Sequence, residues 1–155
     1  MLPLSYADVF LRLSVAVGVG FVIGLDRELR RKPAGLRTMA LVSLGSAVYV
    51  LAALDSGGGV SFDAGSRSIQ GVVTGVGFLG AGAILRGDSD SSVRGLTTAA
   101  SIWLAAATGV ACGLAQWPLV VGSALLGVLV LILSPVERIL HNRRKTDQSD
   151  SSPHQ

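Results

Sequence analysis

The side chains that could do chemistry gather where the first apolar run of the sequence ends. Asp26 and Glu28 flank Arg27, and four more basic residues follow, namely Arg30, Arg31, Lys32 and Arg37. Carboxylates at such a place could hold Mg²⁺, which binds one or two of them and keeps several waters. The neighbouring guanidinium groups argue against this because they repel a dication, and they suit an anionic partner or lipid headgroups.

A simpler interpretation of the same residues is local ion pairing on a helix. Asp26 precedes Arg30 by four residues, and Glu28 precedes Lys32 by four, which are spacings that favour weak pairs. Two further acids, Asp88 and Asp90, fall between later apolar runs. The metal question stays open at this stage, with Asp26, Glu28, Asp88 and Asp90 as the candidates, and no cofactor other than Mg²⁺ is suggested.

The elements that must position these residues are apolar runs. Of the 155 residues, 50% are hydrophobic and 15% are charged, whereas soluble proteins average about 25% charged. A helix needs about 17–25 apolar residues to cross the hydrocarbon core of a bilayer. Five runs are long enough, and they lie at 9–25, 38–54, 69–85, 95–117 and 119–136. In lipid they must be helical, because the backbone finds no other hydrogen-bond partners there. The sequence predicts an all-α membrane domain of five transmembrane helices over 1–136. A polar tail follows at 137–155, and its distal part is predicted to be disordered.

The basic residues predict the orientation of these helices. Of the 13 lysines and arginines, all but Arg12 and Arg67 lie after the first run, after the third run or in the tail. The positive-inside rule therefore places the N-terminus outside and the C-terminus in the cytoplasm. The expected functional surface is a charged cytoplasmic face made of Asp26, Arg27, Glu28, Arg37 and Arg94.

Glycines follow helical spacings within the runs. Gly75, Gly77 and Gly80 match the dinucleotide fingerprint G-x-G-x-x-G, but no second strand with an acidic residue follows, so we reject it. The spacing favours close helix packing instead, either within one subunit or across a homodimer. The predicted packing residues are Gly20, Gly24, Gly71, Gly75, Gly77, Gly80 and Gly82, and Gly109 and Gly113 repeat the spacing.

The fourth run carries a stripe of small and polar residues, which includes Thr97, Ser101 and Thr108. It suits hydrogen bonding between helices, and the alternative is a polar lining for an ion or solute path.

Cys112 is the only cysteine, and no nucleophile and base stand at a catalytic spacing, so no enzyme is predicted. The basic residues separate apolar runs rather than forming a nucleic-acid-binding motif, so the expected partner is the lipid bilayer.

Four motifs in order resemble the MgtC/SapB family of bacterial inner-membrane proteins. They are Gly24-Leu25-Asp26-Arg27-Glu28, Lys32-Pro33-Ala34-Gly35-Leu36-Arg37-Thr38, the run from Gly75 to Leu85, and Val93-Arg94-Gly95-Leu96-Thr97-Thr98-Ala99-Ala100. The resemblance covers residues from about 18 to 115. It implies a multi-pass protein linked to growth in low magnesium, and some members are held to restrain the ATP synthase.

Two features depart from the family pattern. Met39 stands where many members have a histidine, and the short tail leaves no room for the soluble C-terminal domain that many members carry.

Two mechanisms remain. One is a regulatory binding protein that acts on a membrane ATPase or ATP synthase. The other is a transporter or channel for Mg²⁺ or another ion. The absence of a mid-membrane carboxylate favours the regulator, because transporters place their sites near the midplane.

Overall fold

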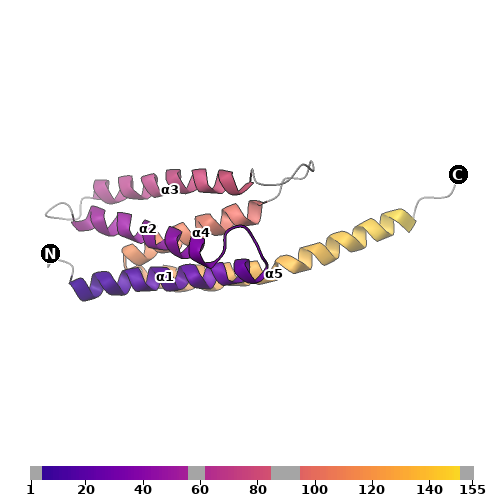
Figure 1. The fold of residues 1–155 in the computed structure, drawn as a ribbon, viewed down its shortest axis with the longest axis horizontal. Coiled ribbons are helices and arrows are strands. Elements are labelled where there is room, and N and C mark those ends of the chain that lie inside the picture. The colour runs from indigo at the N-terminus through magenta and orange to yellow at the C-terminus, as the bar shows by residue number, and fades with distance from the viewer. Residues whose placement is uncertain (1–4, 56–61, 85–94, 151–155) are drawn as a thin grey trace.

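The computed structural model describes residues 5–55, 62–84 and 95–150, which form helices joined by short turns and contain no strand. The helices are α1 (Tyr6–Leu29), α2 (Leu36–Asp55), α3 (Phe62–Ile84), α4 (Leu96–Gly113) and α5 (Trp117–Asp150). Consecutive helices run in opposite directions, as Figure 1 shows. The predicted all-α fold is confirmed, and the glycines of the rejected dinucleotide fingerprint lie inside α3.

Among the described residues, three helices are long and apolar enough to span a membrane, namely α1, α2 up to Leu54, and α4. The apolar part of α5, Trp117–Leu133, is shorter, and α3 is not among the three. Large apolar side chains are also exposed on the outside of the bundle, for example Phe10 at 74% and Phe78 at 82%. Lipid is the solvent that tolerates such a surface. The fold is therefore that of a membrane protein, while five spans and their orientation stay predictions.

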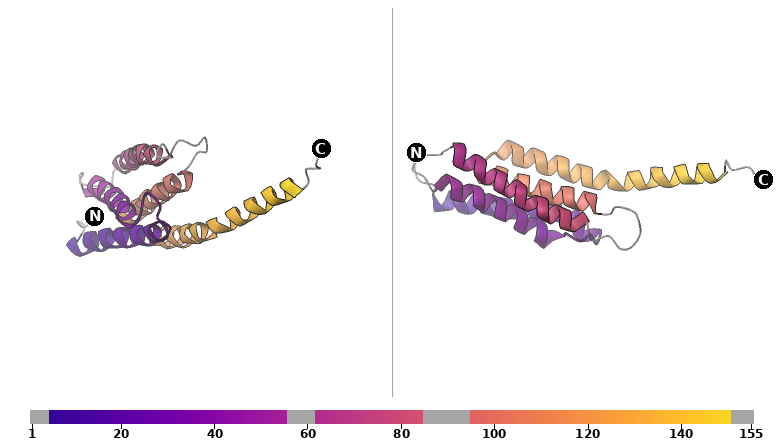
Figure 2. Two further views of the ribbon diagram at one scale, coloured as in Figure 1. Left: turned by 45° about the vertical axis from the view of Figure 1, so that its right-hand side comes forward. Right: turned by 90° about the horizontal axis from the view of Figure 1, so that it is seen from above.

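Helix α4 occupies the centre of the bundle and contacts each of the other four helices. Its buried residues include Ile102, Ala105 and Ala106, which pack with Ile23 and Met39 in the main apolar core. Small residues on α4 let the neighbouring backbones come close. Figure 2 shows α4 between the other helices, and the C-terminal half of α5 projecting beyond the bundle. That helix continues to Asp150, past the predicted membrane boundary at residue 136.

Glycines make the closest helix contacts of the bundle. A Cβ on Gly20 would stand 2.6 Å from Ala40 Cα, and one on Gly24 would stand 2.7 Å from Leu36 Cα, so both lie against α2. Gly109 brings α4 against the backbone of α2 at Ser43, and Gly113 approaches Ala47 and Val50 of α2 less closely, with a Cβ 3.0 Å from Ala47 O. These contacts hold α1, α2 and α4 together as one tightly packed unit.

The glycines of α3 lie differently. A Cβ would meet nothing within 4 Å at Gly71, Gly75, Gly77 or Gly82, and at Gly80 it would meet only Ala99 Cβ, at 3.6 Å. Gly71 and Gly75 line an apolar groove of about 620 Å³ between α2 and α3. Within one subunit most of this glycine face is therefore open, and the predicted homodimer through it stays a prediction.

Replacing Gly75 with leucine tests that homodimer. The added side chain enters open space, so we expect the unfolding temperature of the monomer to change little. A dimer packed through α3 would dissociate, because leucine forces the two helices apart. Cross-linking in native membranes, beside Gly18→Leu as a control on another open glycine, measures the dimer fraction. An unchanged dimer fraction in Gly75→Leu would rule out this face.

Candidate functional site

The charged residues predicted at the end of the first run lie at one end of the bundle, where α1 ends and α2 and α4 begin. We call this the charged end and define it as residues 26–37 together with the first turn of α4, Leu96–Thr98. The turn between α1 and α2 contains Arg31 at a φ of 52° and then Pro33, which cannot donate a helical hydrogen bond. Figure 1 shows the end of α1 beside the beginning of α4.

Arg27 is the most deeply placed charge of this end, with only 3% of its surface exposed. Its Nη2 donates a short hydrogen bond to the Thr98 hydroxyl in the first turn of α4. Its Nε is buried and has no hydrogen-bond partner among the described residues. The guanidinium thus connects α1 to α4, and its unpartnered Nε is costly inside a protein unless a partner arrives.

Each of the two carboxylates beside Arg27 accepts a hydrogen bond through one of its oxygens. Asp26 Oδ1 receives a 2.6 Å hydrogen bond from Arg30 Nε, which is the predicted pair at four residues. Glu28 does not pair with Lys32 among the described contacts. Its Oε2 accepts the backbone N–H of Leu36 at 3.3 Å, so it caps the start of α2. A Cβ on Gly35 would collide with this carboxylate, so a larger residue there would displace the Glu28 side chain from the start of α2.

The remaining members of the predicted face divide into two groups. Arg37 is exposed, and no contact of its side chain is found in the described part of the chain. Arg94, Asp88 and Asp90 lie outside the described residues. Within the described ranges, no group of three or more histidine, cysteine or acidic residues could hold a metal ion. Asp26 Oδ2 is buried and unpartnered, but the guanidinium groups of Arg27 and Arg30 make this single oxygen a poor Mg²⁺ ligand.

The polar stripe of α4 is bonded mainly within its own helix. Ser101 Oγ donates to the carbonyl of Thr97 at 2.7 Å, and Thr108 Oγ1 donates to that of Leu104 at 2.8 Å. Thr108 also meets Ser123 of α5 at 3.3 Å. The hydroxyl that reaches a charged group belongs to Thr98, which the sequence stripe omitted in favour of the exposed Thr97. Both precede Ser101 at a helical spacing, so periodicity alone did not distinguish them.

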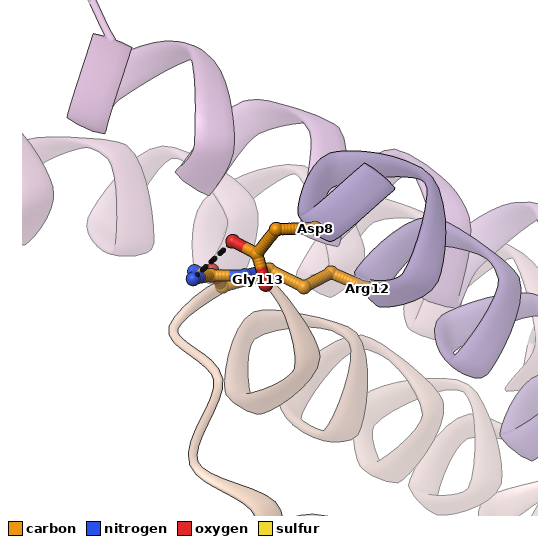
Figure 3. A network of polar contacts seen from close by, with 3 residues as sticks. All are labelled: Asp8, Arg12 and Gly113. Atoms are coloured by element: carbon orange, nitrogen blue, oxygen red, sulfur yellow. Dashed lines mark hydrogen bonds and ion pairs between the residues drawn. The ribbon is translucent and has the colours of Figure 1, made fainter. Parts of the chain in front are cut away.

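A second arginine, which is partly buried, lies at the opposite end of the bundle and was not expected to be a contact residue. Arg12 Nη1 donates to the backbone carbonyl of Gly113 at 2.8 Å, and its Nη2 pairs with Asp8 at 2.6 Å (Figure 3). The side chain is 14% exposed and reaches the last residue of α4. The cation satisfies a carbonyl at the C-terminus of α4, where the helix dipole favours positive charge.

Comparison with known proteins now identifies the family. The sequence matches the MgtC family over residues 13–140. The chain belongs to the MgtC family. It is 47% identical over 117 residues to "Protein SrpB" of Synechococcus elongatus, covering 70% of this chain and 64% of that protein. It is 45% identical over 107 residues to "Protein MgtC" of Salmonella typhimurium, covering 69% of this chain and 44% of that protein.

A further MgtC-family relative is an uncharacterized protein of Haemophilus influenzae, 36% identical over 152 residues, which cover 89% of this chain and 62% of that protein. The chain thus spans less than two thirds of the length of each of these three relatives. No solved structure matches it. Met39, which the sequence analysis singled out as a departure from the family pattern, is fully buried. It packs as an apolar residue in the main core.

Proposed function

We propose that this MgtC-family chain is a multi-pass protein of the bacterial inner membrane that acts in adaptation to low magnesium as a regulatory binding protein. The charged end faces the cytoplasm in this proposal, because it holds Arg27, Arg30, Arg31, Lys32 and Arg37 and the positive-inside rule keeps such residues inside. We propose no catalytic step, since the role requires only recognition of another molecule.

The observation that supports a binding role most directly is the state of the two carboxylates. Asp26 is paired with Arg30, and Glu28 caps α2. A Mg²⁺ path would need acidic oxygens free to replace waters of the ion, and the described helices offer none in their central turns. Exposed basic groups such as Arg31 and Arg37 remain available instead. We propose that they contact an acidic surface of a membrane ATPase or ATP synthase.

The alternative is a transporter or channel for Mg²⁺ or another ion. In that case Mg²⁺ is the transported substrate, and Asp26 Oδ2, which is buried without a partner, is the first oxygen that it would meet. We rank this second because Arg27 and Arg30 flank that oxygen and would repel the dication.

Flux of Mg²⁺ into proteoliposomes distinguishes the two functions. The purified chain is compared with Asp26→Asn and with a known Mg²⁺ channel as positive control. We expect no flux above that of empty liposomes from either form while the control conducts. Flux that disappears in Asp26→Asn would overturn the regulator and establish transport. The matching positive result for regulation is that the membrane ATPase binds to the wild-type chain and binds less to Arg37→Glu.

A further inference from the structure

The strongest unexplained feature of the molecule is the buried guanidinium of Arg27 at the first turn of α4. An arginine with only 3% of its surface exposed normally has its donors satisfied, yet among the described residues its Nε has no partner and its Nη2 bonds only to the Thr98 hydroxyl. Thr98 carries no negative charge, so no described carboxylate is hydrogen-bonded to this buried cation.

The start of α4, which Arg27 contacts, is itself a positive end of a helix and favours an anion. The first N–H groups of an α-helix have no partner within the helix, and the helix dipole makes that end positive. At α4 the N-cap is Gly95, which has no side chain to accept a hydrogen bond. Gly95 has a φ of 93°, and a Cβ there would stand 3.3 Å from Ile84 Cα. The uncapped, positive end of α4 and the guanidinium thus meet at one place.

Among the described residues, no carboxylate forms a hydrogen bond with Arg27. Asp26 attracts the guanidinium through space but bonds to Arg30 through its Oδ1 and leaves its Oδ2 unpartnered, and Glu28 is directed to the start of α2. Arg31, Lys32 and Arg37 lie on the same end and add positive charge. Positive groups therefore exceed negative ones among residues 26–37, before the dipole of α4 is considered.

We propose that Arg27 and the first turn of α4, Leu96–Thr98, form a binding site for a phosphate-type oxyanion. Tetrahedral oxyanions suit both partners, because backbone N–H groups at a helix start bind them and the planar guanidinium offers parallel donors to two oxygens. The anion takes Arg27 Nε and N–H groups of the first turn, while Thr98 Oγ1 holds the guanidinium in position. Two sources share this chemistry, namely a free phosphate compound in the cytoplasm and the headgroup of an anionic lipid.

The test measures thermal unfolding of the full chain in nanodiscs, in two arms. The first arm uses phosphatidylcholine discs and compares inorganic phosphate with chloride at equal ionic strength. The second arm uses phosphate-free buffer and compares phosphatidylglycerol discs with phosphatidylcholine discs. A ligand that binds only the folded state raises the unfolding temperature. A rise in the first arm identifies free phosphate as the source, and a rise in the second arm alone identifies the lipid headgroup.

Matched variants decide whether the site is the one described. Arg27→Gln and Arg37→Gln each remove one positive charge at the charged end, but only Arg27 is buried against α4. We expect Arg27→Gln to lose the rise and Arg37→Gln to keep it. Arg27→Lys, which retains the charge without the planar fork, should bind about tenfold more weakly. Thr98→Val should still respond, because the fork remains.

Three results would overturn the site. One is a wild-type chain that responds in neither arm. Another is an equal loss in Arg27→Gln and Arg37→Gln, because that indicates general attraction to a basic surface. If Arg27→Gln does not fold, the test uses the nitrogen NMR resonance of Arg27 Nε in the wild-type chain. The third overturning result is that this resonance does not shift under the conditions that raise the unfolding temperature. None of these measurements depends on whether the chain regulates an ATPase or moves Mg²⁺.

Discussion

Gly109→Ala should destabilise the bundle, although alanine is the better helix former. A Cβ at this position would collide with the carbonyl oxygen of Ser43 and stand 2.8 Å from Ser43 Cα. These are backbone atoms of α2, which cannot rotate away as a flexible side chain can, so the two helices must separate. We expect a loss of about 1–3 kcal/mol for such overpacking, reduced by the gain of roughly 1 kcal/mol in helix propensity.

Gly122→Ala provides the matched control for this change. Gly122 is also in a helix, α5, but a Cβ there meets nothing within 4 Å. We therefore expect unchanged or slightly higher stability, up to about 1 kcal/mol. Reversible unfolding in mixed micelles, followed by helical circular dichroism, measures both. Equal stability of Gly109→Ala and the wild-type chain would show that α2 and α4 are not in the close contact described.

Arg12→Leu should weaken the opposite end of the bundle. The substitution leaves the Gly113 carbonyl without its 2.8 Å donor and Asp8 without its 2.6 Å partner. Both groups lie beside the turn between α4 and α5, where Ala115 has a positive φ of 54°. Leaving partly buried polar groups unsatisfied costs about 1–3 kcal/mol. We expect faster amide exchange over residues 114–116 together with a lower unfolding temperature.

Arg67→Leu separates this effect from the loss of any surface charge. Arg67 also pairs with an aspartate four residues away, Asp63, but at 3.5 Å and with side chains that are 71% and 78% exposed. Exposed pairs of this kind contribute about 0–1 kcal/mol, so we expect little change. If Arg12→Leu and Arg67→Leu were indistinguishable in both measurements, the contact between Arg12 and α4 would have no role in stability.

Both predictions concern α4, which touches every other helix and is tied to α1 at each end. Arg12 bonds to its C-terminal turn, and Arg27 bonds to its first turn. The two arginines lie in very different fields, because the dipole of α4 favours a cation at its C-terminus and disfavours one at its N-terminus. This asymmetry leaves Arg12 electrostatically balanced and makes Arg27 the place where an anion would bind.

Local patterns predicted a substantial part of this arrangement. The length and apolarity of the runs predicted helices, because lipid offers the backbone no other partner. The spacing of Asp26 and Arg30 predicted their pair, since residues four apart on a helix are neighbours. The motif G-x-x-x-G predicted close contacts, and Gly20, Gly24, Gly109 and Gly113 make them with α2.

Other contacts depended on which helices became neighbours. Glu28 has Lys32 at an ideal spacing, yet it caps α2, because the chain turns back after Leu29 and brings the Leu36 N–H to it. Thr98 and not Thr97 faces Arg27, since the rotation of α4 about its axis is fixed by packing on all sides. Gly71 and Gly75 of α3 have the same spacing as Gly20 and Gly24 of α1, but only the latter two meet a backbone.

Composition and short-range pattern were enough to predict that this chain forms apolar helices with a basic end, and they include the motifs of the MgtC family. These properties reside in composition, periodicity and short-range spacing, which act within one helix or one loop. The packing of distant helices brings Arg12 and Arg27 to α4 and leaves Arg27 Nε without a partner among the described residues. Such pairings join residues 101 and 71 positions apart, and helical periodicity contains no information about which faces of distant helices will meet.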